Sequence, residues 1–242
     1  SGDPPLSYQT DIRNQDRAVG TRLSGEIAFR IGDMGMPDDS IDFRLQGSAG
    51  QSFGSFLVPG IRLTLVGEAN DYVGKGIRGG EIVLKPPPDA AFEPHDAVIL
   101  GNTALYGATG GRLFAAGKAG ERFAVRNSGA WAVVEGAGHH CCEYMTGGVV
   151  VVLGETGYNF AAGMSGGIAY VWDKDGIFPQ RLNSDMVEIR RAGEHDDVRI
   201  LKALLERHMD LTQSPRAADV LANWDRQVLR FWRISAKTIE VP

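Results

Sequence analysis

The chain has 242 residues and a formal net charge of −5, with 23% charged and 43% hydrophobic residues. This balance excludes a disordered chain, and the longest aliphatic run, 149–153, is far shorter than the roughly 20 residues of a membrane span. The negative charge disfavours a nucleic-acid partner, which needs clustered Lys and Arg. Since the sequence shows no signal peptide, we expect a cytoplasmic protein with no membrane partner.

Residues 1–40 are expected to form a lead-in that contains one helix. Leu23, Ile27 and Ile31 are spaced four apart, and this spacing gives a helix one apolar face. Strand-like sequence begins at 41, where the character of the chain changes. We therefore place the start of the main structural unit at this point.

Glycine is unusually frequent, with 32 residues or about 13% of the chain, and it recurs periodically. Segments 45–64 and 65–84 align without a gap. Downstream, a pair of small residues followed by an apolar run recurs at spacings of 31, 18, 19 and 19 residues, and 85–96 in the long step is interpreted as an inserted loop. The glycines interpreted as structural are Gly47, Gly54, Gly60, Gly67, Gly74, Gly80, Gly111, Gly129, Gly148 and Gly167.

This repeat predicts an all-β core over residues 41–190, a parallel β-helix (solenoid) of about six or seven coils. Each unit is too short to be a domain, and its Val-, Ile- and Leu-rich run is continuously apolar, as expected for parallel strands. Glycine suits coil corners that need unusual backbone angles, so Gly80→Val and Gly148→Val are predicted to misfold the chain. The alternative, a glycine-rich α/β domain, is disfavoured because 41–172 lacks an amphipathic helix.

Residues 191–242 are predicted to form a helical tail that caps the solenoid or docks against another surface. Four residues give the first helix an apolar face: Val198, Leu201, Leu205 and Met209. Asp196 or Asp197 is expected to cap its start. This acidic pair, like Asp38 and Asp39 at a turn, is therefore interpreted as structural rather than catalytic.

A second helix is predicted over 215–229. Ser214 and Pro215 suit the N-cap and the first helical position. Three apolar residues follow, and we expect them to dock against this domain or a neighbouring one: Phe231, Trp232 and Ile234.

Two short motifs resemble nucleotide-binding and hydrolase signatures. Residues 74–79 fit GxGxxG, and residues 50–54 fit GxSxG with Ser52 at the nucleophile position. Both signatures require a helix directly after the motif, but strand-like sequence follows the first and Pro59 follows the second. We therefore interpret both as copies of the structural repeat.

The run 139–143, His-His-Cys-Cys-Glu, resembles a metal cluster, but no second pair of ligands accompanies it. The adjacent cysteines also predict no structural disulfide. Four cations could form an anion-binding ridge, although solvent-facing charges are the default interpretation: Lys75, Arg78, Arg112 and Arg126. We predict no catalytic, cofactor-binding or metal-binding residue in this chain, which leaves a rigid structural or interaction module.

The chain resembles the C-terminal domain of the large subunit of glutamate synthase, the glycine-motif (GXGXG) β-helix domain. The matching stretches are 14–32, 47–84, 99–136, 141–173 and 218–235. The resemblance implies that the β-helix is right-handed and carries no catalytic residue. It also implies a chain that is either an excised domain or a separate subunit, because the catalytic N-terminal Cys and the cluster cysteines of the family are absent.

In that family, the enzyme makes two L-glutamate from L-glutamine, 2-oxoglutarate and reducing equivalents. The resemblance implies partners in an amidotransferase domain and a synthase domain, on the same chain or on separate subunits. A small NADPH-oxidising subunit is a further candidate partner. It implies that FMN and an iron–sulfur cluster are held by the rest of the enzyme, with NADPH or ferredoxin as electron donor.

Two alternatives remain open at the level of sequence. A related β-helix is a subunit of formylmethanofuran dehydrogenase and shares the glycine repeat, but lacks the start at 16–27 and the tail containing Asn223-Trp224. The chain could also be an independent ligand-binding β-solenoid.

Overall fold

A computed structural model describes residues 6–32 and 34–237, so parts of the predicted lead-in and tail (1–5, 33 and 238–242) lie outside the described residues. Its strands form one sheet in the order β1-β2-β3-β4-β6-β7-β8-β9-β11-β10, with β5 pairing β3 and β6. The strands are β1 (Leu6–Ile12), β2 (Ile41–Ala49), β3 (Ile61–Ala69), β4 (Glu81–Lys85), β5 (Val98–Leu100), β6 (Arg112–Ala119), β7 (Ser128–Ala137), β8 (Thr146–Val152), β9 (Gly166–Trp172), β10 (Val187–Arg191) and β11 (Phe231–Ala236).

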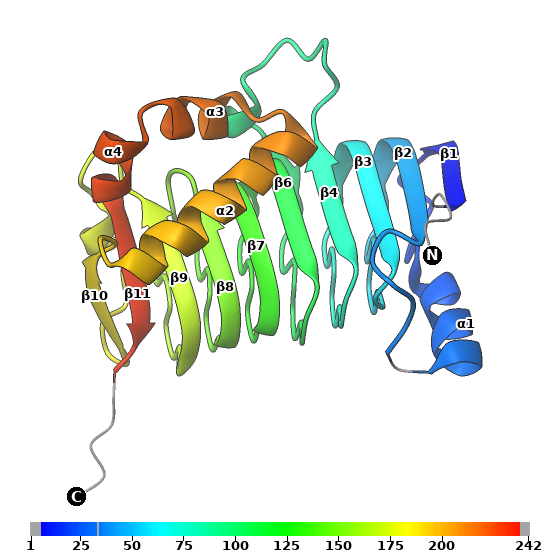
Figure 1. The fold of residues 1–242 in the computed structure, drawn as a ribbon, viewed down its shortest axis with the longest axis horizontal. Coiled ribbons are helices and arrows are strands. Elements are labelled where there is room, and N and C mark those ends of the chain that lie inside the picture. Colours follow the sequence, from blue (N-terminus) through cyan, green and yellow to red (C-terminus); the bar gives the residue numbers. More distant parts are fainter. Residues whose placement is uncertain (1–5, 33, 238–242) are drawn as a thin grey trace, which may run out of the picture.

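Strands β1 to β9 pair in parallel, and the coils that carry them stack into a solenoid of about 7 turns. The predicted parallel β-helix is thus confirmed. Figure 1 shows the strands side by side along the long axis of the molecule. The inserted loop is also confirmed, because the chain leaves β4, projects from the solenoid and returns through a short 3-10 helix, η1 (Pro94–Asp96).

The helices lie at the ends and on one face of the solenoid (Figure 1). They are α1 (Thr21–Ile31), α2 (His195–Thr212), α3 (Pro215–Ala222) and α4 (Trp224–Gln227), with the short helices η2 (Phe178–Gln180) and η3 (Val228–Arg230). Helix α2 crosses the outer face of the sheet obliquely, and α1 lies at the N-terminal end. In the described part of the chain, no helix has the length and hydrophobicity that crossing a membrane requires.

From β4 onward the sheet is buried on both faces, which explains the continuously apolar runs of these strands. One register row points into the solenoid: Leu45, Leu65, Leu84, Ala115, Val134, Val152 and Val171. The neighbouring row points outward: Arg44, Thr64, Val83, Phe114, Val133, Val151 and Tyr170. From Phe114 onward this outer row packs beneath Leu201, Leu204 and Leu205 of α2 in a second hydrophobic core.

The two ends differ from the sequence prediction. The solenoid sheet begins before residue 41, since β1 pairs with β2 from Leu6 opposite Ile41. Helix α1 forms as predicted, but only Ile27 of its expected apolar stripe is fully buried, and Ile31 is 58% exposed. The division into 1–40, 41–190 and 191–242 as structural units stays a prediction.

The tail is not wholly helical. Strand β11 pairs antiparallel with β9, and β10 pairs with β11, so Phe231 and Ile234 become fully buried within this domain. The predicted helix over 215–229 is interrupted at Asn223 and continues as α4 and η3. Its start agrees with prediction, because the Ser214 hydroxyl accepts a hydrogen bond from the Ala217 amide at 3.0 Å.

Candidate functional site

One side of the solenoid has an unusual alternating backbone. In six successive coils, three residues spaced two apart adopt left-handed conformations with φ between 54° and 67°. The segments are 52–56, 72–76, 103–107, 122–126, 140–144 and 159–163, and we call this side the left-handed face. A left-handed residue other than glycine costs about 1–2 kcal/mol, so such a repeated pattern requires compensation from neighbouring coils.

Hydrogen bonds between coils supply that compensation. The amides of the first and third left-handed residues donate to the following coil, as from Ser52 to the Asp71 carbonyl and from Phe56 to the Lys75 carbonyl, both at 2.8 Å. The amide of the middle residue donates to the preceding coil, as from Gly74 to the Phe53 carbonyl at 2.8 Å. The backbone of this face is therefore hydrogen-bonded to the coils on both sides, although it contains no strand.

The middle left-handed residues are all buried inside the solenoid: Gly54, Gly74, Leu105, Ala124, Cys142 and Ala161. The first and third left-handed residues of each coil form two outer columns along the solenoid, and these residues are at least partly exposed to solvent. Side-chain size along the middle column is therefore set by the solenoid interior, whereas the outer columns are available for contacts beyond this chain.

Of the ten glycines interpreted as structural, nine have φ between 63° and 144°, and Gly129 does not. The register explains the exception: Glu81, Arg112, Trp131, Val149 and Ile168 pair in one row, so the residue at the corner of β7 is Ala130. The Asn127 side chain holds this corner through hydrogen bonds of 2.8 Å and 3.0 Å to the Ala130 backbone. Gly129 lies one residue out of the expected register.

The two short motifs belong to the repeat. Residues 74–79 begin in the left-handed face and lead into β4, whereas 50–54 place Ser52 in a left-handed turn. No helix follows either motif, so the structural context of a dinucleotide site or a nucleophile elbow is missing. Of the four predicted ridge cations, Lys75 and Arg126 lie on the left-handed face with Arg78 just beyond it. Arg112 lies elsewhere, bonded to Asp38.

The run 139–143 lies in the turns of the left-handed face and not on a strand. Cys141 and Cys142 are free and fully buried with their Sγ atoms 3.7 Å apart, and burial together with the neighbouring thiol raises the pKa of Cys141. His139 Nδ1 accepts a hydrogen bond from the Tyr158 amide at 2.8 Å. Within residues 6–32 and 34–237, no group of three or more His, Cys, Asp or Glu could hold a metal ion.

Three buried acidic residues connect α2 with the sheet. Glu81, at 3% exposure, receives Arg62 at 2.8 Å, Arg112 at 3.2 Å and Arg207 of α2 at 2.7 Å. A desolvated carboxylate is stable only when cations or donors surround it, and here three guanidinium groups do so. Glu81 therefore joins β3, β4 and β6 to the C-terminal half of α2.

Glu135 forms the second connection, with His208 and Ser214. Its Oε1 lies 3.3 Å from His208 Nε2 and accepts a short hydrogen bond from the Ser214 hydroxyl, and all three residues are buried. The residue types match a hydrolytic triad, but the serine contacts the carboxylate instead of the imidazole. The cluster is closed to substrate and fastens α2 and the start of α3 to β7.

Asp197 forms the third connection, at the start of α2. It was expected to be an N-cap candidate together with Asp196, but the N-cap is Glu194, and Asp197 lies in the first turn. Its carboxylate accepts from the Tyr170 hydroxyl at 2.7 Å and from Arg190 at 2.6 Å. Burial, with this hydrogen bond, raises the pKa of Tyr170.

Sequence reasoning missed these three connections, although one signal was present. Glu81 and Glu135 interrupt or border otherwise apolar strands, in GGEIVL and WAVVEGA. A carboxylate in such a run predicts a buried partner, but the sequence does not say which one. The partners come from a helix more than 70 residues further along the chain.

The three left-handed positions of each coil have the spacing of a G-x-G-x-G motif, and residues 2–237 match the family described as GXGXG motif. The chain belongs to the GXGXG family. It is 54% identical over 220 residues to ferredoxin-dependent glutamate synthase 2 of Synechocystis sp., a match that covers 91% of this chain and 14% of that protein.

Other glutamate synthases show the same pattern. The chloroplastic ferredoxin-dependent glutamate synthase of Spinacia oleracea is 52% identical over 92% of this chain and 14% of its own length. The glutamate synthase [NADH] of Schizosaccharomyces pombe is 50% identical over 95% of this chain and 11% of its own length. The GXGXG chain thus corresponds to a small part of much longer relatives, and its recognition as the β-helix domain of the glutamate synthase large subunit is confirmed.

Proposed function

We propose that this chain is a structural domain of a glutamate synthase and positions the glutaminase domain and the synthase domain relative to one another. The observation that carries the proposal is a match spanning 91% of this chain but only 14% of a ferredoxin-dependent glutamate synthase. The enzyme would make two L-glutamate from L-glutamine, 2-oxoglutarate and reducing equivalents. The relatives favour this assignment over a formylmethanofuran dehydrogenase subunit.

The domain itself is proposed to be non-catalytic and to bind no cofactor. Its buried acidic residues Glu81, Glu135 and Asp197 are all bonded within the fold, where they fasten α2 to the sheet. Rigidity of this kind suits an element that sets the distance between two reacting sites. FMN and the iron–sulfur cluster would be held by other parts of the enzyme.

The electron donor and the compartment belong to the same proposal. Relatives at similar identity are named for ferredoxin and for NADH, so the likeness to these relatives does not identify the electron donor. NADPH or ferredoxin is proposed for this enzyme, with a small NADPH-oxidising subunit as partner in the first case. A cytoplasmic location is proposed for it, although the relative from Spinacia oleracea is named chloroplastic.

The experiment is to purify, from the source cells, the native protein that contains this sequence and to measure its intact mass, flavin, iron and glutamate formation. We expect a polypeptide or complex several times larger than this chain that makes glutamate from glutamine and 2-oxoglutarate. Limited proteolysis should then release a fragment containing this sequence without flavin or iron. A native protein of this size alone, or flavin remaining on the fragment, would contradict the proposal.

A further inference from the structure

The left-handed face presents exposed aromatic side chains. Phe56, Tyr72 and Tyr144 are 54%, 38% and 53% exposed, although each lies in a rigid turn. Phe56 and Tyr144 cover glycines of the next coil, so their rings are fixed against the backbone. Exposed aromatic groups on an ordered backbone are characteristic of protein interfaces, because little conformational freedom is lost when a partner binds.

The same face carries an excess of positive charge. Lys75, Arg122 and Arg126 belong to its segments, whereas the acid within them, Glu143, is 14% exposed and already lies near Arg122 and His140. Lys75 lies over the Tyr72 ring at 5.5 Å, and Arg126 makes no ion pair with any described residue. This positive surface stands out on a chain whose net charge is −5.

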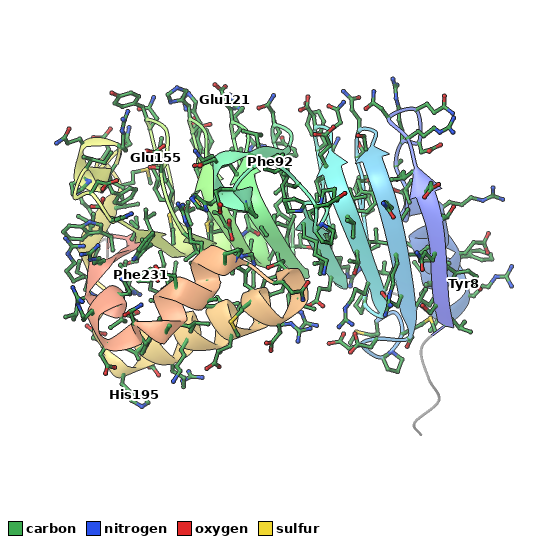
Figure 2. The ribbon with its side chains drawn as sticks, turned by 90° about the horizontal axis from the view of Figure 1, so that it is seen from above. Tyr8, Phe92, Glu121, Glu155, His195 and Phe231 are labelled. Atoms are coloured by element: carbon green, nitrogen blue, oxygen red, sulfur yellow. The ribbon has the colours of Figure 1, made fainter. Side chains whose placement is uncertain are left out.

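Two acidic residues border the face, so the excess of positive charge is confined to the six left-handed segments themselves. Asp71 and Glu121 each precede a left-handed segment by one residue, and Asp71 is engaged by the Asn102 amide at 2.8 Å. Figure 2 shows Glu121 on the side of the solenoid remote from α2 and the other tail helices. The tail helices therefore lie on the opposite side of the solenoid from Glu121 and leave this side uncovered.

We propose that the left-handed face is the surface on which an acidic region of another domain of the same enzyme docks. The inference rests on the proposed function and adds to it the docking face and the chemistry of the partner. Tyrosine and arginine are enriched where protein interfaces gain most of their binding energy. Complementary charge fixes the orientation of the partner. A nucleic acid is disfavoured because an acidic chain with so few exposed cations on one face would bind phosphates weakly.

The test uses the whole native enzyme and an amine-reactive ester, with labelling of Lys75 compared to that of exposed Lys202 on α2. Docking should slow Lys75 labelling about ten-fold relative to Lys202. The Arg126→Asp enzyme should relieve this protection about three-fold or more, because the substitution reverses a charge two coils away from Lys75. Asp tolerates the left-handed conformation, so the fold should persist.

Arg226→Asp is the matched control, since Arg226 is exposed on α4, away from this face. It should leave Lys75 protected. Equal labelling of Lys75 and Lys202, or no effect of Arg126→Asp, would overturn the docking surface. The proposed function is tested separately, by the size and the glutamate synthesis of the native enzyme. Protection lost after nuclease treatment would indicate a nucleic acid, and protection lost on dilution with a halved native mass would indicate a second copy. Either result would overturn the inference.

Discussion

Replacement of Gly148 by alanine is expected to destabilise the chain through a backbone overlap. Gly148 has φ 84°, and an added Cβ would lie 2.3 Å from the Ala130 carbonyl oxygen and 2.9 Å from Asn127 Nδ2. The left-handed conformation costs about 1–2 kcal/mol for alanine, and the reduced freedom of the unfolded chain returns about 0.4–1 kcal/mol. The overlap adds about 1–3 kcal/mol, because a neighbouring backbone must move.

The matched control is Gly107→Ala. Gly107 has φ 62° but nothing within 4 Å of its added Cβ, and Arg126 and Tyr144 occupy the equivalent position in later coils. Its cost should be limited to the conformational contribution, about 0–1.5 kcal/mol. The difference between the two variants therefore isolates the overlap at the coil corner.

The measurement is thermal unfolding followed by circular dichroism, with denaturant midpoints as a second readout. For a chain of this size, about 1 kcal/mol shifts the melting temperature by about 2–4 °C. Gly148→Ala should lower it by about 5–15 °C, and Gly107→Ala by less than about 5 °C. Equal shifts in the two variants would refute the argument that close coil packing, rather than the left-handed backbone alone, requires glycine at 148.

Three further predictions concern the buried polar groups. The pKa of Tyr170 is raised in the folded state, so its contribution to stability is complete below about pH 10 and declines above it. Tyr170→Phe should therefore weaken the dependence of unfolding free energy on pH above about pH 10. An unchanged pH dependence would count against this. Cys141 and Cys142 should resist a thiol reagent in the native chain and react after unfolding, and rapid native labelling would disprove their burial. Glu81→Gln should cost about 3–5 kcal/mol in urea unfolding, because buried guanidinium groups lose their counter-charge; a loss below about 1 kcal/mol would show that water replaces it.

The repeat could be predicted from sequence because each coil imposes the same local requirements. The period of the repeat, its apolar runs and the position of the inserted loop all follow from contacts between adjacent coils. These coils lie about 20 residues apart in the chain. The same reasoning missed β1, since 6–12 has neither the glycine nor the continuous apolar run of the repeat and pairs with a strand that begins only at Ile41. It also placed Gly129 one residue out of register, because Asn127 and Ala130 replace the glycine corner by a side-chain hydrogen bond.

The candidate surface could be predicted only in part. Lys75, Arg78 and Arg126 were singled out as a possible ridge, but the sequence does not reveal that Arg112 faces a different side, where Asp38 binds it. Nor does it show that segments such as 140–144 form a turn with three left-handed residues, since most of these residues are not glycine. Their conformations are stabilised by the coils above and below.

The sequence by itself determined the solenoid, its approximate number of coils and the family, because these follow from a short-range repeat and from long identical strings. The tertiary structure decided that a strand of the tail, β11, pairs with the last parallel strand, β9, and which acidic residues are buried. Arg44 and Thr64 share an outward register row with Phe114 and Val133, yet only the later members lie beneath α2. That difference depends on contacts between residues far apart in the chain, such as Glu81 with Arg207, 126 positions away, which no local pattern encodes.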